Sequence, residues 1–137
     1  MHALAHAVAA LEAAAEAGRA VALVSATDAG LSAGPGWFRE MIAEAREAVP
    51  TARCTALLDC GDDAGAVQAA IRAGVEAIVF TGRADVGARL ADIAGQRGIM
   101  LLTQRPQAAL DLGTLFFAAA DLLRRRCQAA LDPLGRA

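Results

Sequence analysis

The chain contains no lysine, no tyrosine and no asparagine among its 137 residues, and all 13 of its basic residues are arginines. Without lysine the protein cannot form a Schiff base with a carbonyl substrate, attach pyridoxal phosphate or supply the lysine of a P-loop. Pyridoxal phosphate is therefore excluded as a cofactor, and no other cofactor is indicated by the sequence.

Cysteine is scarce as well: Cys54, Cys60 and Cys127 are odd in number and form no CxxC pair. We expect free, mostly buried thiols and a cytoplasmic protein, because a reducing compartment keeps such cysteines unpaired. No stretch of about 20 residues is free of charge, so no membrane span is expected. The apolar N-terminus carries Glu12 and Glu16 and lacks a basic region, which favours a helix over a signal peptide.

Positive charge is also not concentrated. The net charge is −2, and the single basic run is Arg124-Arg125-Arg126. A nucleic-acid partner is therefore not expected, since such proteins carry a basic stripe or patch. Aromatic residues make up 4% of the chain and hydrophobic residues 56%, many of them alanine. This composition predicts a core of small aliphatic side chains.

Apolar runs of strand length alternate along the chain with helical patterns. Strands are expected at 20–25, 54–59, 75–80 and 99–102, and helices at 3–17, 35–48, 62–73, 85–96 and 110–131, with a loop of small residues at 27–36. Strands that are apolar throughout are typical of parallel sheets. We therefore expect one α/β domain over residues 1–137, with four short parallel strands alternating with helices. Two arrangements stay open: a three-layer doubly wound sheet, or a half-barrel-like sheet of sequential strands that a partner would complete.

One helix–strand unit runs from Ala70 to Phe80, reads AIRAGVEAIVF, and continues into Thr81-Gly82. It resembles the βα units of phosphate-binding TIM barrels of the 2-keto-3-deoxy-6-phosphogluconate aldolase and thiamine-phosphate synthase types, and the resemblance covers residues 52–103. What it implies is an anion site at the strand ends. The chain departs from those barrels because it has half their strands and no lysine for an aldolase Schiff base.

Ligands of parallel α/β folds bind at the carboxyl ends of the strands, and Asp59 closes the second expected strand. Partial desolvation there would raise the pKa of this carboxyl toward the range of a general base. The alternative is that Asp59 caps a turn or pairs with Arg83. Asp62 and Asp63 either join Asp59 around a divalent cation or, as we favour, cap the following helix.

Two later strand ends carry the same pattern, Thr81-Gly82-Arg83 and Thr103-Gln104-Arg105. Each places a hydroxyl and a guanidinium at the edge of the sheet, which suits a phosphate or a carboxylate, unless both are solvated loops. The loop containing Ser32, Gly34 and Gly36 leads into a helix and is a further candidate for anion contact. Trp37 either stacks on a ligand or, more often for such a residue, pins the helix to the sheet.

Histidines are few, at positions 2 and 6. Their i, i+4 spacing is that of metal ligands on a helix, but no third ligand lies nearby in the sequence, so no metal site is predicted. Cys60 is a candidate nucleophile for which neither histidine is an obvious base, so a buried thiol is expected.

The expected last helix has a wide apolar stripe, and we predict homodimerisation through it. The stripe comprises Leu112, Leu115, Phe116, Ala119, Leu122, Leu123, Cys127, Ala130 and Leu131. Two functional hypotheses follow. In the first, the domain binds a small anionic molecule; its catalytic version is a lyase or isomerase with Asp59 as base and Arg83 and Arg105 on the anion. In the second, it is a non-catalytic regulatory or scaffolding module that dimerises through this helix.

Overall fold

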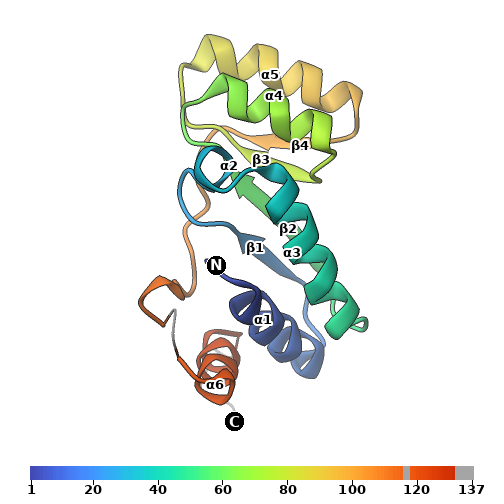
Figure 1. Cartoon of the computed structure of the whole chain (residues 1–137), viewed down its shortest axis with the longest axis vertical. Helices are drawn as coiled ribbons and strands as arrows, with labels where there is room; N and C mark the ends of the chain where they lie inside the picture. Colours follow the sequence, from blue (N-terminus) through green and yellow to red (C-terminus); the bar gives the residue numbers. More distant parts are fainter. Residues whose placement is uncertain (116–117, 132–137) are drawn as a thin grey trace. The chain divides into compact units, whose positions relative to one another are not determined.

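The structure, a computed structural model, describes residues 1–115 and 118–131. Four strands alternate with the helices and form one all-parallel sheet in the order β1-β2-β3-β4 (Figure 1). The strands are β1 (Val21–Val24), β2 (Cys54–Asp59), β3 (Ala77–Val79) and β4 (Met100–Leu102). The helices are α1 (Leu4–Ala17), α2 (Ala29–Ser32), α3 (Pro35–Ala48), α4 (Ala64–Ala73), α5 (Ala84–Gln96) and α6 (Ala120–Leu131), with one 3-10 turn, η1 (Gly113–Leu115). The predicted α/β class with four parallel strands is therefore correct.

The strand numbers increase steadily across the sheet. A doubly wound sheet needs a reversal of strand order, at which its ligand crevice forms. The observed order has no such reversal and is the sequential order of the half-barrel-like alternative. In sheets of that order, the carboxyl ends of the strands carry the ligand sites.

The chain divides into two compact units. Unit 1 comprises Met1–Leu23, Met41–Thr55 and Ala108–Ala137, and unit 2 comprises Val24–Glu40 and Ala56–Gln107.

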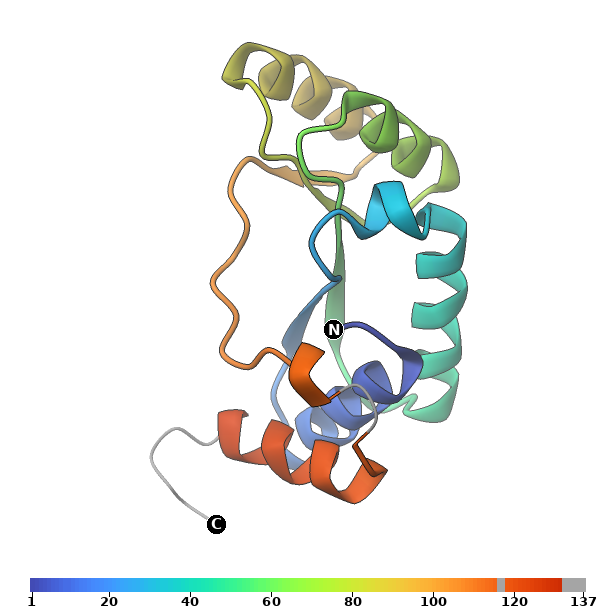
Figure 2. The ribbon, with the colours of Figure 1, turned by 60° about the vertical axis from the view of Figure 1, so that its left-hand side comes forward.

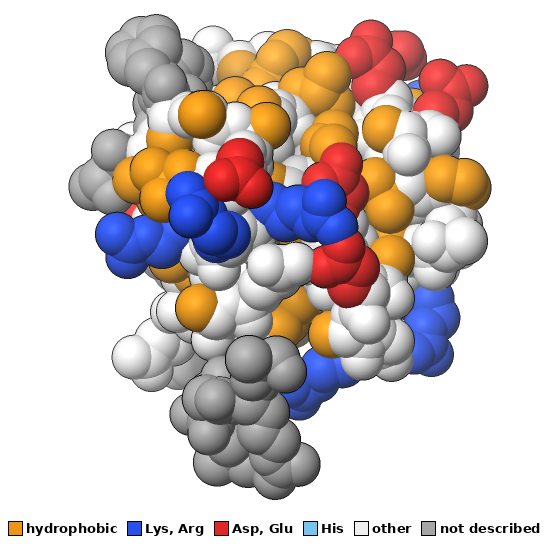
Figure 3. All heavy atoms as spheres, turned by 90° about the horizontal axis from the view of Figure 1, so that it is seen from below, with side chains coloured by type: hydrophobic (Ala, Val, Ile, Leu, Met, Phe, Trp, Pro, Cys, Tyr) orange, Lys and Arg blue, Asp and Glu red, His pale blue; other side chains and the backbone are white. Residues whose placement is uncertain are grey.

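In unit 1, helices α1 and α6 lie side by side (Figure 1). Small side chains of α1 make this close approach possible, since Ala9 and Ala13 pack against Leu112, Leu123 and Cys127. Ion pairs border this core: Arg124 of α6 contacts both Glu12 and Glu16 of α1. Figure 3, seen from the end where these helices lie, shows basic and acidic side chains next to one another among hydrophobic ones. Part of the apolar stripe of α6 is thus already used inside unit 1.

In unit 2, strands β2, β3 and β4 are paired so that Leu57 is opposite Ala77, and Val79 is opposite Leu102. These four side chains pack together, with Val24 beside them, as an apolar cluster made of strand residues. Helices α4 and α5, which connect these strands, lie together on one side of them (Figures 1 and 2).

The predicted helix over 110–131 is wrong in its first half, because α6 begins at Ala120, and within the described residues 110–115 the chain forms only the 3-10 turn η1. Asp111 Oδ1 accepts a hydrogen bond from the backbone N–H of Gly113, at 2.8 Å. Such a bond gives the backbone an alternative to a helix, and glycine weakens the helix further. Leu112 and Leu115 still pack into the core of unit 1 as expected from the stripe. Phe116 lies outside the described residues.

The expected loop over 27–36 also differs, because it contains the short helix α2. The N-terminal end of α2 is stabilised by Ser32, the last residue of this helix, whose hydroxyl donates a hydrogen bond to the Asp28 carbonyl at 3.1 Å. The following helix α3 begins at Pro35 as predicted, and its buried face consists of Phe38, Met41, Ile42 and Ala45. Trp37 is 40% exposed, whereas its neighbour Phe38 is 2% exposed. Phe38, and not Trp37, is therefore the aromatic residue that anchors α3.

The remaining boundaries match the predictions within two residues, apart from β3, which is three residues long instead of six. Among the described residues, no helix is both long enough and apolar enough to cross a membrane.

Candidate functional site

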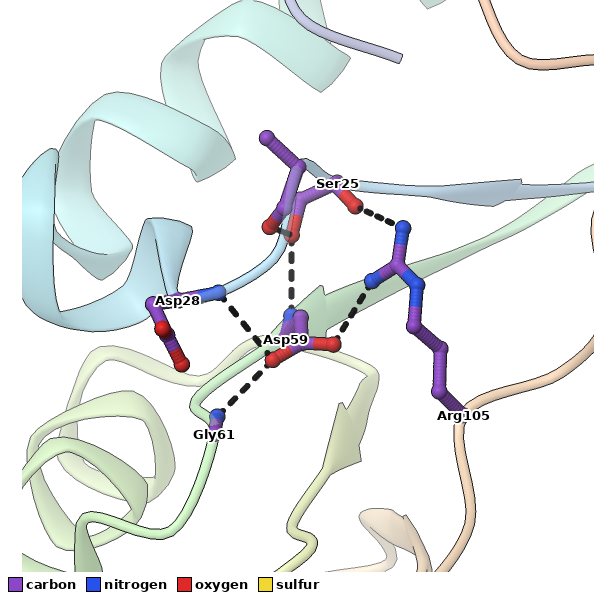
Figure 4. Close-up of polar contacts among 6 residues, drawn as sticks. Ser25, Asp28, Asp59, Gly61 and Arg105 are labelled. Atoms are coloured by element: carbon purple, nitrogen blue, oxygen red, sulfur yellow. Dashed lines mark hydrogen bonds and ion pairs between the residues drawn. The ribbon is translucent and has the colours of Figure 1, made fainter.

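Asp59 lies at the end of β2, and its carboxylate is buried. Its Oδ1 accepts hydrogen bonds from the backbone N–H groups of Gly61, at 2.8 Å, and Asp28, at 3.2 Å. Its Oδ2 accepts a hydrogen bond from Nη1 of Arg105 at 2.6 Å (Figure 4). The side chain therefore closes the turn after its own strand and also connects two distant segments of unit 2.

Arg105 follows β4, and its guanidinium is fixed at two points. Besides the Asp59 contact, Nη2 donates to the backbone carbonyl of Ser25, at 2.9 Å. The side chain is 33% exposed, whereas that of Asp59 is 2% exposed. A guanidinium has further N–H donors beyond these two. The buried carboxylate thus orients a cation whose remaining surface is accessible to solvent.

Ser25 joins the ends of β1 and β2 and is fully buried. Its hydroxyl accepts a hydrogen bond from the backbone N–H of Asp59, at 2.9 Å, and donates one to the carbonyl of Ala26, at 3.0 Å. The hydroxyl therefore satisfies a backbone group that burial would otherwise leave without a partner. Ser25, Asp59 and Arg105 form a connected network, which we call the strand-end network.

The alternative considered for Asp59, capping a turn or forming an ion pair, agrees with this geometry, but the partner is Arg105 and not Arg83. All three donors occupy the carboxylate oxygens that a general base would need to offer to a substrate. As an ion pair with satisfied hydrogen bonds, the arrangement instead compensates the cost of burying the charge. The geometry favours Asp59 as a residue that positions Arg105.

Arg83 is placed differently. It precedes α5, its Nη2 lies 3.0 Å from Oδ2 of Asp85, and its side chain is 80% exposed. The structure does not bring Arg83 into the strand-end network. Thr81 and Thr103 are exposed at the ends of β3 and β4, and the backbone N–H of Thr81 donates to the Gly61 carbonyl at 2.7 Å.

Asp28 follows β1 and is a part of the site to which the sequence pattern assigns no role. It adopts a left-handed conformation with φ of 61°, and among the residues that the structure describes it is the one non-glycine with positive φ. Its backbone N–H binds Asp59, while its exposed carboxylate lies over Gly61 (Figure 4). No described residue donates a hydrogen bond to that carboxylate. The sequence signal for it is weak: an aspartate four residues after a strand, before small residues.

The predicted anion loop lies between α2 and α3. Ser32 ends α2 with its hydroxyl bonded to Asp28, Gly34 has φ of 90°, and Gly36 belongs to the first turn of α3. The conformation of Gly34 is one that other residues rarely adopt, which explains the need for glycine there. The anion role of this loop stays a prediction.

Of the two aspartates after β2, Asp63 caps a helix, as expected. Asp63 accepts a hydrogen bond from the backbone N–H of Ala66 at 2.7 Å, at the N-cap of α4. In the part of the chain that the structure describes, no group of three or more histidine, cysteine, aspartate or glutamate side chains could hold a metal ion.

Cys60 is buried, as predicted, and its thiol has low reactivity. Burial, followed by the negative charges of Asp59 and Asp63, raises the pKa of its thiol to about 12. The thiolate is the nucleophilic form of cysteine, so this residue is unsuited to covalent catalysis. Gly30 packs directly on the sulfur, since a Cβ at that position would lie 2.6 Å from Sγ.

No protein-family model matches the chain, and a search of curated proteins finds no significant match. The chemistry of the site therefore has to be inferred from its geometry. This geometry offers a preorganised, partly exposed guanidinium at the carboxyl end of a parallel sheet, with an exposed carboxylate and two hydroxyls on neighbouring strand ends.

Proposed function

We propose that this chain binds a small anionic molecule, carrying a phosphate or a carboxylate, at the carboxyl ends of the strands of unit 2. The observation that carries the proposal is the guanidinium of Arg105, which is held by Asp59 and Ser25 yet remains one-third exposed. Arginine suits this task because its planar group can bind two anion oxygens at once. A guanidinium that is already fixed loses less conformational entropy on binding.

Location supports the same proposal. Ligand sites of parallel α/β proteins lie at this edge of the sheet. The resemblance of residues 52–103 to units of phosphate-binding barrels would place an anion at the same edge. Thr81 and Thr103 are exposed at neighbouring strand ends and could add hydroxyl contacts.

A catalytic version of this proposal, a lyase or isomerase with Asp59 as base, requires more. Asp59 would have to exchange one of its three donors for substrate before it could accept a proton. We therefore place binding first and assign Asp59 to positioning Arg105. The proposal keeps the cytoplasm as the compartment, because Cys54, Cys60 and Cys127 are all free thiols in the structure.

The test is a thermal-shift screen followed by titration calorimetry on the full chain. The panel contains inorganic phosphate, sugar phosphates, nucleotides and keto acids. A ligand present at 100 times its Kd stabilises the native state by about 2.7 kcal/mol, so a saturable rise in Tm is expected with one anion class. Flat responses across the panel, confirmed by calorimetry, would contradict the proposal.

Two variants sharpen this test. Arg105→Lys keeps the charge but loses the planar fork, and we expect at least a tenfold weaker affinity, equal to about 1.4 kcal/mol. Arg97→Gln is the matched control, because Arg97 is an exposed arginine at the other end of α5, beside the amino end of β4. Equal affinities of both variants and the unmodified protein would remove Arg105 from the site.

Homodimerisation through α6 stays a prediction. Leu123 and Cys127 of that helix are covered by α1 within unit 1, so a dimer would have to use other residues of α6. Light scattering coupled to size-exclusion chromatography decides this directly. A monomer mass at all concentrations would exclude the scaffold hypothesis in its dimeric form.

A further inference from the structure

A pair of histidines and an aspartate form a cluster in unit 1, apart from the strand-end network. The rings of His2 and His6 stand edge to face, with centroids 6.0 Å apart. His2 Nε2 lies 3.2 Å from Oδ1 of Asp111, and that same oxygen accepts the backbone N–H of Gly113. The cluster therefore connects the N-terminal turn of α1 to the segment that forms η1.

His6 is the central residue of this cluster and is fully buried. Its Nδ1 accepts a hydrogen bond from the backbone N–H of His2, at 3.0 Å. A ring nitrogen can accept such a bond only while it carries no proton. Protonation of Nδ1 would place two N–H groups face to face and would also charge a side chain without access to water.

We propose that His6 acts as a pH-responsive latch, which holds the first turn of α1 against residues 111–115 when neutral and releases it when protonated. The two states differ by one proton on Nδ1 of His6. In the closed state that nitrogen binds the His2 amide, and in the open state the imidazolium is solvated.

The surroundings of His6 favour its neutral form. Burial is the largest effect and lowers the pKa of His6 below its ordinary value of 6.5. The amino terminus and His2 lower it further, whereas a hydrogen bond with the Leu115 backbone and the charge of Asp111 oppose the shift. Helix α6 presents Leu123 and Cys127 to this core, and burial raises the pKa of Cys127, so its thiol is neutral. Arg124 of α6, which also faces α1, is paired with Glu12 and Glu16.

The experiment uses the full chain, in which His2 and His6 are the only histidines. Nuclear magnetic resonance follows the two imidazole signals with pH, and a His2→Gln variant assigns them. Hydrogen exchange then measures the protection of the amides of His6, Ala7, Gly113 and Leu115. Those of His6, Ala7 and Leu115 close the turns of α1 and η1, and that of Gly113 binds the Asp111 side chain.

We expect His6 to titrate below pH 6.5. Between that pH and its own pKa, protection of these amides should fall about tenfold per pH unit, because the open state binds one more proton. In a His6→Leu variant, which fills the buried site without a titrating group, the loss should disappear. Should that variant fail to fold, Asp111→Asn serves instead: it removes the charge that favours protonation of His6 in the closed state, so His6 should titrate at a lower pH and the loss of protection should continue further into acid.

Two results would overturn the latch. One is a His6 signal that titrates at or above its ordinary value while protection stays constant. The other is the same pH-dependent loss of protection in the His6→Leu variant, which would assign the effect to other groups.

Discussion

Gly61 and Asp28 approach so closely that a Cβ at position 61 would lie 1.9 Å from Oδ1 of Asp28. Gly61 also has φ of 56°, a left-handed conformation. Both facts arise from one arrangement: the turn after β2 bends back so that its N–H can reach Asp59, and the Asp28 side chain covers it. The geometry of this turn determines where both carboxylates lie.

Replacement of this glycine should therefore destabilise the protein. Gly61→Ala is expected to lower the free energy of unfolding by about 1–2 kcal/mol, because alanine is strained in the left-handed conformation. The loss is larger if the Asp28 side chain cannot move away from the new Cβ. Chemical denaturation measures the change. Gly95→Ala is the matched control: Gly95 lies in α5 with open space where a Cβ would be, so alanine there should stabilise by about 0.5–1 kcal/mol. A neutral Gly61→Ala would show that the turn is free to rearrange.

The ion pair of Asp59 and Arg105 should respond asymmetrically to mutation. Arg105→Gln leaves the buried carboxylate uncompensated and is expected to cost about 3 kcal/mol or more, within the range for broken buried pairs. Asp59→Asn leaves a guanidinium that is one-third exposed and can be hydrated, so its cost should be smaller. Urea denaturation of both variants checks the order.

Arg83→Gln provides the reference for an exposed pair. Arg83 and Asp85 are 80% and 53% exposed, and such pairs contribute between about 0 and 1 kcal/mol. Equal destabilisation by Arg83→Gln and Arg105→Gln would show that the buried and the exposed ion pair contribute alike, contrary to expectation.

The free energy of unfolding should depend on pH through the protonation of His6. Its pKa is lowered in the folded protein, so between the folded value and about 6.5 the unfolded chain binds more protons. The unfolding free energy should therefore be constant above pH 6.5, fall as the pH drops below it, and level off below the folded pKa. Denaturation curves at half-unit pH steps measure this, and His6→Gln should flatten that window.

Asp111 affects a different pH window. The Gly113 backbone N–H and His2 lower its pKa from 3.8, so its contribution is present above about pH 4 and is lost only in stronger acid. A loss of stability confined to pH values below 4 would assign the effect to carboxylates and would count against His6.

The cysteines should differ in reactivity. With a pKa of about 12, about one Cys60 thiol in ten thousand is ionised to the reactive thiolate at pH 8. Cys54 is only partly buried, so iodoacetamide should modify it first, as mass spectrometry of peptides would show. Rapid alkylation of Cys60 in the native protein would mean that its surroundings open readily.

The elements that sequence patterns predicted well are those in which periodicity and end signals agree. Helix α3 runs from Pro35 to Ala48 as expected, and Gly74 ends α4. The start of the last helix was predicted wrongly, because its apolar spacing continues through residues 110–119. The hydrogen bond between the Gly113 backbone and the Asp111 side chain instead favours a non-helical backbone there. Periodicity reports which face is buried, and it does not report which hydrogen bonds the backbone prefers.

The candidate site was predictable in place but not in its connections. A carboxylate at the end of β2 and arginines after β3 and β4 follow from the strand assignments. Which arginine reaches Asp59 does not, because Arg83 finds Asp85 two residues away, whereas Arg105 has no acidic residue nearby in the sequence. The left-handed conformation of Asp28 likewise depends on contacts with a distant turn.

The donors to Asp59 come from positions 2 residues after it, 31 residues before it and 46 residues after it. The nearest can form as soon as the turn after β2 closes, but the other two require long loops of chain to close, which carries an entropic cost. The carboxylate is therefore fully compensated only when three separated stretches of unit 2 have assembled. Asp59 consequently destabilises partly folded states relative to the native state, because burial of its carboxylate before Arg105 is in place leaves an unpaired charge inside the protein.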